Sequence, residues 1–300
     1  MLTIAFAKNY EHPLPEGHRF PMEKYGLLPR QLTYDGTATE DNFFVPSPAE
    51  VEDILRVHDK AYWQRLRALQ LTKSEQRRSG FPLSKALVDR EITIAGGSIQ
   101  NLYHAKTYGC SLNIAGGTHH AYTNRAEGFC LLNDIAISAA HGLDKGMIKK
   151  ALVIDLDVHQ GNGTAEIFAH TPEVFTFSMH GEKNYPLHKE VSDLDIPLPD
   201  DTDDETYLSM LYETLRILRK KVDPDVIYFQ AGVDVLASDK LGRLGLSIDG
   251  CRQRDQIVFE YAHKYSIPVA VSMGGGYSKH LPDIVNAHAN TFREARKIFF

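Results

Sequence analysis

The stretch "ALVIDLDVHQGNGTAEIF", residues 151–168, joins an apolar run to a set of polar side chains. Its first four residues are apolar, as expected for a strand that is covered on both faces. Asp155, Asp157 and His159 then follow at alternate positions. Alternate side chains of an extended chain share a face, so two carboxylates and an imidazole converge where the strand ends. On its own, this run fits a metal-binding edge and a buried salt-bridged cluster equally well.

Similar apolar runs, rich in β-branched residues, recur along the chain and predict further buried strands. They cover residues 2–7, 111–115, 151–156, 174–179, 226–230 and 268–273. Five of them are followed by polar or glycine-rich residues, which read GGTHH, DVH, SMHG, QAGVD and GGGY. Ligands of parallel sheets bind beyond the carboxyl ends of the strands, so we expect these five segments to meet at one edge.

Helical patterns lie between the predicted strands. Residues 47–66 open with a capping-box pattern and Pro48 at the first helical position, residues 203–221 repeat leucine at helical spacing, and residues 249–265 form a weaker third case. The acidic segment 193–205 ends where the second helix begins, so its last carboxylates are interpreted as partners of the helix dipole. Alternating strands and helices predict one α/β domain, residues 1–300, with a mostly parallel central sheet in a three-layer α/β/α arrangement.

Composition narrows the class of protein. The net charge of −6 and the absence of long Lys/Arg clusters argue against nucleic-acid binding. The N-terminal apolar run stops at Ala7, too short for a signal peptide, and no run of 18 apolar residues predicts a membrane span. Three widely spaced cysteines argue against a disulfide framework. We therefore expect a cytoplasmic protein with no membrane or nucleic-acid partner, and its oligomeric state is left open.

Four further residues follow predicted strands and carry chemically useful groups. Asp234 can join the first cluster at the sheet edge, although in isolation a capping or turn Asp is the favoured interpretation. His119 and His120 are adjacent after a glycine turn, so one can face a reaction centre while the other supports it; surface His pairs also occur by chance. Tyr277 follows three glycines that let the backbone approach a ligand, a common arrangement by itself.

In their order and spacing, four segments resemble the signature segments of the histone deacetylase superfamily. They read GGTHHAYTNRAEGFCLLNDIAI, VIDLDVHQGNG, YFQAGVDVLASDKLG and SMGGGYS. The N-terminal YEHPLPEGHRFPMEKYGLL also resembles the opening of that family, and Gln160 with Asn162 resembles class IV members and their bacterial relatives. The resemblance implies an arginase/deacetylase fold. It also implies a metal-dependent hydrolase that removes acetyl or longer acyl groups from acyl-lysine or a related acylated amine.

The resemblance assigns metal ligands residue by residue. Asp157, His159 and Asp234 match the zinc ligands of the family. This donor set has two carboxylates, one imidazole and no thiolate, so it also accepts Fe(II). Potassium is implied at a deeper site that would be formed by Asp155, Ser178 and Met179.

The resemblance also assigns catalytic and substrate-binding roles. His120 matches the general base and acid, Asn162 stands where its orienting partner lies, and His119 matches the supporting histidine oriented by Asp155. Tyr277 matches the donor to the substrate carbonyl. The expected substrate-binding residues are Phe129, Tyr185, Gly128 and Gly275.

Asn162 departs from the commonest family pattern, which has an Asp at this position. A neutral amide favours the imidazolium less than a carboxylate does, so we expect a lower pKa for His120. Three alternative functions stay open: a binuclear manganese ureohydrolase, an inactive acyl-lysine binder, and an acetylpolyamine or small-metabolite amidohydrolase. Gly161 argues against the first, because that chemistry needs a carboxylate there. The segments 33–46 and 72–94 are expected to be loops that carry no readable substrate code.

Overall fold

The computed structural model describes all residues from 1 to 300, and its strands form one eight-stranded sheet in which every pair is parallel. The strand order is β2-β1-β3-β8-β7-β4-β5-β6. The strands are β1 (Ile4–Ala5), β2 (Phe43–Phe44), β3 (Cys110–Asn113), β4 (Ala151–Asp155), β5 (Val174–Gly181), β6 (Leu194–Leu198), β7 (Val226–Gln230) and β8 (Val269–Ser272). Parallel pairing brings all the carboxyl ends to one edge of the sheet.

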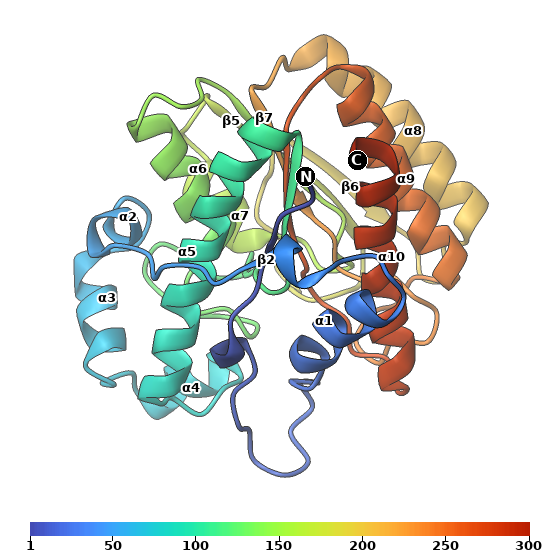
Figure 1. Cartoon of the computed structure of the whole chain (residues 1–300). Coiled ribbons are helices and arrows are strands. Elements are labelled where there is room, and N and C mark those ends of the chain that lie inside the picture. Colours follow the sequence, from blue (N-terminus) through green and yellow to red (C-terminus); the bar gives the residue numbers. More distant parts are fainter.

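Helices cover both faces of this sheet (Figure 1). One layer includes α5 packed on α6, and the other holds α1, α10, α9 and α8 in contact from one to the next. The bounds are α1 (Lys24–Tyr34), α2 (Val51–Leu55), α3 (Lys60–Arg67), α4 (Lys73–Ser79), α5 (Lys85–Tyr108), α6 (Asp134–Asp144), α7 (Asn162–Phe168), α8 (Asp204–Lys221), α9 (Ile248–Lys264) and α10 (Leu281–Phe299), with short 3-10 turns at Lys8–Tyr10 and Glu40–Asn42. The predicted three-layer α/β/α class is confirmed.

All six predicted strands are present, and the sheet has two edge strands that the apolar pattern did not reveal. β2 has only two residues, and β6 lies inside the acidic segment 193–205. The end of that segment behaves as expected, because Asp203 caps α8 and accepts a hydrogen bond from the Thr206 amide at 3.0 Å. Edge strands are half exposed, so their sequences need no long apolar run.

The prediction for residues 47–66 was wrong at its start. The capping box at Ser47 does not form, because residues 47–49 run extended against α5 and the helical segments are α2 and α3. The Ala49 amide donates to the Ile92 carbonyl at 3.0 Å. A side chain at Gly96 of α5 would collide with the Ser47 carbonyl, so the glycine permits this close approach. Tertiary packing therefore overrides the local capping signal.

The prediction of a loop over 72–94 was also wrong. This segment contains α4 and the first turns of the 24-residue helix α5. Thr72 and Glu75 form the capping box that opens α4, and Gly80 ends it in the left-handed conformation. Residues 33–46 likewise include the end of α1, a 3-10 turn and β2.

The interior joins the sheet to both helical layers through one cluster of 81 buried apolar residues. All three cysteines are buried and free, which confirms that no disulfide framework exists. No helix has both the length and the apolar character needed to cross a bilayer. The polar residues that follow β3, β4, β7 and β8 are buried at the carboxyl edge of this interior, where water cannot stabilise them.

Candidate active site

A buried group of three potential metal ligands lies just beyond β4 and β7. Asp157, His159 and Asp234 each offer one ligand atom, and these atoms all lie within 4.8 Å of one another. The Nδ1 atom of His159 is 3.0 Å from Asp157 Oδ1 and 3.1 Å from Asp234 Oδ2. A Cβ at Gly275 would collide with the Asp234 carboxylate, so the glycine turn after β8 closes tightly on the group. The three residues are thus brought together as the sequence predicted.

The protonation of this group shows that it attracts positive charge. Burial and the charge of Asp157 raise the pKa of Asp234 to about 7. Burial lowers the pKa of His159, but its hydrogen bonds to the carboxylates of Asp157 and Asp234, together with their negative charges, overcome this effect and raise the pKa to about 10. Burial opposes ionisation of Asp157 as well, yet His119 and His159 hold its pKa well below the usual range. Two carboxylates in a dry site therefore retain a proton on the imidazole between them.

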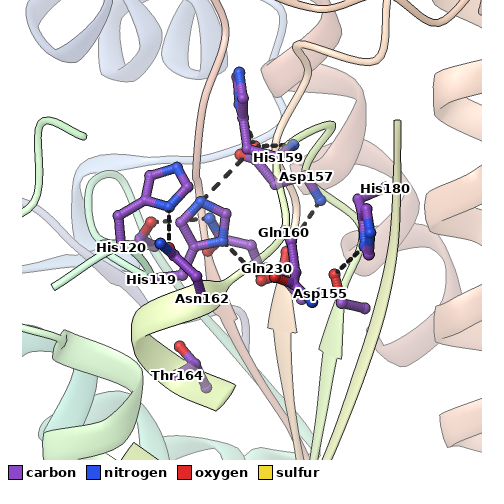
Figure 2. Close-up of polar contacts among 12 residues, drawn as sticks. His119, His120, Asp155, Asp157, His159, Gln160, Asn162, Thr164, His180 and Gln230 are labelled. Carbon is purple, nitrogen blue, oxygen red and sulfur yellow. Dashed lines mark hydrogen bonds and ion pairs between the residues drawn. The ribbon is translucent and has the colours of Figure 1, made fainter. Parts of the chain in front are cut away.

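The two adjacent histidines contact different polar partners (Figure 2). His119 Nδ1 lies 2.7 Å from Asp155 Oδ2, and although burial disfavours the imidazolium, Asp155 and Asp157 raise the pKa of His119 to about 9. His120 Nδ1 lies 2.6 Å from Asn162 Oδ1. Burial and the charges of His119 and His159 lower the pKa of His120 well below its ordinary value. His119 is thus a cation at pH 7, while His120 is a neutral base.

Glu127, which the sequence analysis did not single out, stands behind Asn162. Its Oε1 accepts from Asn162 Nδ2 at 3.0 Å and from the Tyr185 hydroxyl at 2.6 Å. The Asn162 amide also donates to the Tyr122 hydroxyl at 2.9 Å, which fixes Asn162 Oδ1 toward His120. Asn162 itself carries no negative charge, but the Glu127 carboxylate contacts its amide on the side away from the His120 imidazole. The only signal for Glu127 in the sequence was its position directly before "GFC". Its burial is seen only in the structure.

Tyr277 and Phe129 border the cavity above the ligand group. Both are buried, with ring centroids 5.9 Å apart, and Gly128 and Gly275 line the same cavity. Burial and the charges of Asp234 and Asp157 raise the pKa of Tyr277 well above its ordinary value, so its hydroxyl stays protonated. Tyr185 lies on the outer side, with its ring 5.2 Å from that of His120. Three of the expected substrate-binding residues, Gly128, Phe129 and Gly275, thus border the inner cavity, and Tyr185 borders the outer hollow together with Gly128 and Phe129.

Lys24 is a second buried residue that the sequence analysis missed. It is 1% exposed and donates to the Gly274 carbonyl at 3.2 Å. Burial lowers the pKa of Lys24 to about 8, while the charges of Asp234 and Asp157 oppose this effect. A lysine in the segment "MEKYGLL", which the family resemblance covered, was the available signal. It places a positive charge behind the ligand group, which offsets part of the repulsion between the two carboxylates.

The expected potassium site remains a prediction. Asp155 and Ser178 are neighbours in the β4–β5 pairing, and both are buried. The Ser178 hydroxyl lies 2.9 Å from His180 Nδ1, and Met179 is buried next in β5. The residues named for the potassium site are therefore close together on β4 and β5, and Asp155 joins them to His119.

Comparisons with known proteins place this chain in one class, the deacetylase hydrolases. Residues 18–292 match the histone deacetylase domain family. An uncharacterized protein of Picosynechococcus sp. is 40% identical over 296 residues, which is 99% of each chain. Histone deacetylase 2 of Arabidopsis thaliana is 30% identical over 291 residues, covering 93% of this chain and 75% of that protein.

Solved structures of HDAC homologs have the same fold as this chain. The crystal structure of an HDAC homolog from Aquifex aeolicus has a TM-score of 0.85 and 26% identity, covering 99% of this chain and 84% of that one. A structure of an HDAC homolog complexed with SAHA gives the same TM-score. The chain belongs to the histone deacetylase family, and it is a hydrolase of the deacetylase type.

Metal binding should release protons in a pH-dependent number. Metal ligands must be deprotonated. With a pKa of about 10 for His159 and about 7 for Asp234, we expect about one proton released per ion at pH 8.5 and about two at pH 6. Calorimetric titration of the metal-free protein with zinc, in buffers of different ionisation enthalpy, counts them. Binding without proton release at either pH would contradict this protonation scheme.

The charge behind His120 should set the acidic limb of the pH–rate profile. Asn162→Asp places a carboxylate against His120, stabilises the imidazolium and should move that limb upward by about one pH unit. Glu127→Gln removes a negative charge while keeping an acceptor oxygen for Tyr185, so the limb should move downward. A profile of kcat/KM against pH measures both variants. If the acidic limb moved in the same direction in both variants, the electrostatic account would be refuted.

Proposed function

We propose that the protein is a zinc-dependent amide hydrolase that removes acetyl or longer acyl groups from acyl-lysine. One observation carries the proposal: Asp157 and His159 of the buried Asp–His–Asp ligand group border a single cavity together with a neutral imidazole and a protonated tyrosine hydroxyl. The HDAC homolog complexed with SAHA supports it, because a protein of the same fold forms a complex with that ligand. The proposed domain is residues 1–300, since one sheet and one apolar core include the whole site.

The donor set fits a divalent cation. Two carboxylates and one imidazole match catalytic zinc sites, which use three protein ligands and leave a further position open. The burial and mutual repulsion of Asp157 and Asp234 are relieved by a cation. Zinc bound there supplies Lewis acidity, polarising the amide carbonyl and lowering the pKa of an adjacent water from about 15.7 to about 7. Fe(II) offers the same chemistry with these ligands.

His120 is the proposed proton carrier. Its Nδ1–H donates to Asn162, so the lone pair of Nε2 is free to accept the proton of the attacking water. The resulting imidazolium then returns that proton to the leaving lysine amine as the carbon–nitrogen bond breaks. His119 does not compete for this role, because Asp155 keeps it protonated. The different surroundings of the two histidines thus give them different roles, His120 as the base and His119 as a fixed cation.

Tyr277 is the proposed donor to the carbonyl oxygen as negative charge develops on it. Its backbone amide donates to Asp239 Oδ2 at 2.6 Å, which anchors the residue in the glycine-rich turn after β8. The raised pKa of the Tyr277 hydroxyl ensures that it carries a proton at neutral pH. Phe129 and Tyr185 flank the path to this point, so an extended acyl-lysine chain can pass between aromatic walls.

A comparison of acyl-lysine substrates tests the function. Acetyl-, butyryl- and myristoyl-lysine peptides should be hydrolysed by zinc-loaded protein, and 1,10-phenanthroline should abolish the activity. Zinc added back should restore it, with Fe(II) as a parallel sample. Binding of the peptides without hydrolysis under any metal would identify a binding protein instead and refute the proposal.

Removing the Tyr277 hydroxyl should impair chemistry and leave binding nearly intact. A donor of this type contributes about 3 to 4 kcal/mol in the transition state. Tyr277→Phe should therefore lower kcat roughly 100- to 1,000-fold with little change in KM. Steady-state kinetics measures both constants, and Tyr212→Phe, an exposed tyrosine of α8, is a matched control. Equal kcat in Tyr277→Phe and the control would remove Tyr277 from the mechanism.

A further inference from the structure

The mouth of the active-site cavity is cationic. A hollow of about 400 Å³ lies outside the ligand group, and it is bordered by Arg19, Arg77 and Arg78 together with Phe129 and Tyr185. None of the ten residues around this hollow is Asp or Glu. The chain as a whole has 39 acidic and 33 basic residues, so the mouth reverses the sign of the overall charge. We call Arg19, Arg77 and Arg78 the arginine rim.

The arginine rim has no acidic partner and no side-chain hydrogen bond within the protein. All three side chains are exposed, and none forms a salt bridge or a side-chain hydrogen bond, whereas Arg65 nearby in sequence pairs with Glu75 at 2.6 Å. Arg77 and Arg78 occupy the last turn of α4, where a cation complements the helix dipole. Arg19 belongs to no helix, so the dipole does not explain why it joins them.

The backbone ties the rim to the wall of the substrate path. The Gly128 amide donates to the Arg78 carbonyl at 3.1 Å, and the Phe129 amide donates to the Ser79 carbonyl at 2.8 Å. These bonds hold Phe129 at a φ of 66°, a left-handed conformation that is unfavourable for an aromatic residue. The Arg19 guanidinium lies 4.9 Å from the centre of the Phe129 ring. The backbone at the end of α4 and the Arg19 guanidinium are therefore both held beside the ring that borders the cavity.

The nearest acidic groups do not neutralise the rim. Glu127 precedes Gly128, but the residue is only 9% exposed. Its carboxylate accepts hydrogen bonds from Asn162, Tyr185 and Arg125. Asp239 accepts from the backbone amides of Tyr277, Leu241 and Gly242. Lys240, next to Leu241 at the mouth, adds a further exposed cation. An anion entering the mouth thus meets guanidinium groups with free donors.

We propose that the arginine rim selects acyl-lysine substrates that carry a carboxylate close to the lysine α-carbon, at the end of the side chain away from the acylated amine. This inference rests on the proposed function, because it takes the scissile amide to lie between His120 and Tyr277. Two sources supply that chemistry: an acidic residue beside acyl-lysine in a peptide, or the α-carboxylate of free acyl-lysine. Acylated polyamines carry positive charge at this point, so the rim disfavours them relative to substrates with a carboxylate there.

The test compares matched substrates of opposite charge. One acetyl-lysine peptide is flanked by Glu and another by Lys, and a second pair is Nε-acetyl-lysine with a free or an amidated carboxyl group. Exposed ion pairs are individually weak, so we expect about a five- to tenfold higher kcat/KM for the Glu peptide at low salt. The preference should shrink at 0.5 M NaCl through screening. Preference for acetyl-lysine over its amide identifies the small-molecule source, and preference confined to peptides identifies the other.

Charge reversal in the rim should reverse the preference. The double substitution Arg77→Glu/Arg78→Glu should favour the Lys peptide, and Arg19→Glu, outside any helix, should reduce the Glu preference without touching α4. Arg30→Glu, an exposed arginine of α1 that borders a different hollow, is the matched control and should behave as the wild type. Equal kcat/KM for both members of each pair, or an unchanged Glu preference in all the rim variants, would overturn the inference.

A second measurement separates this inference from the proposed function. Fluorescein-labelled versions of the two peptides are titrated against chelator-treated protein, and anisotropy gives their dissociation constants without turnover. Tighter binding of the Glu peptide, lost in the rim variants, supports the inference even if no peptide is hydrolysed and the proposed function fails. Equal binding, or binding of neither peptide, overturns it.

Discussion

The site depends on the electrostatic relation between Asp157, His159 and Asp234. These groups are buried within 4.8 Å of one another, where water cannot stabilise two carboxylates of like charge. A positive charge must therefore lie among them, and the imidazole retains a proton for this reason. The surrounding structure is arranged to the same end, since Lys24 lies behind the group and the charged His119 lies at its side. A site held in this state is prepared to exchange its proton for a divalent cation.

The parallel sheet creates this relation between residues that are far apart in sequence. Asp157 and His159 follow β4, Asp234 follows the neighbouring β7, and Tyr277 follows β8, which pairs with β7. All of these strands end at the same edge, so each contributes one group without any long excursion of the chain. Neutral His120 and charged His119 come from the turn after β3. Asp155 keeps His119 protonated, whereas Asn162 leaves His120 neutral and able to accept a proton.

The sequence predicted the features that depend on local pattern and motif. The six interior strands have apolar runs because both faces are covered, and the alternation of Asp155, Asp157 and His159 needs only extended geometry. The three proposed metal ligands, both histidines and Tyr277 therefore come together as expected. The capping box at Ser47 failed because close packing of residues 47–49 on Gly96 replaced it. The edge strand β6 escaped notice because half of its surface is exposed and its residues are mixed.

Other parts of the site depend on tertiary contacts that no short pattern encodes. Glu127 matters because Asn162 and Tyr185 reach it from different segments, and the arginine rim exists because Arg19 meets the end of α4 across the Phe129 ring. The measurement that tests the central claim most directly is an anomalous difference map, recorded at the zinc edge, from crystals of zinc-loaded protein. The account predicts one strong peak about 2.0 to 2.2 Å from Asp157, His159 and Asp234. A fully occupied peak elsewhere, with these three side chains still hydrogen-bonded to one another, would contradict it.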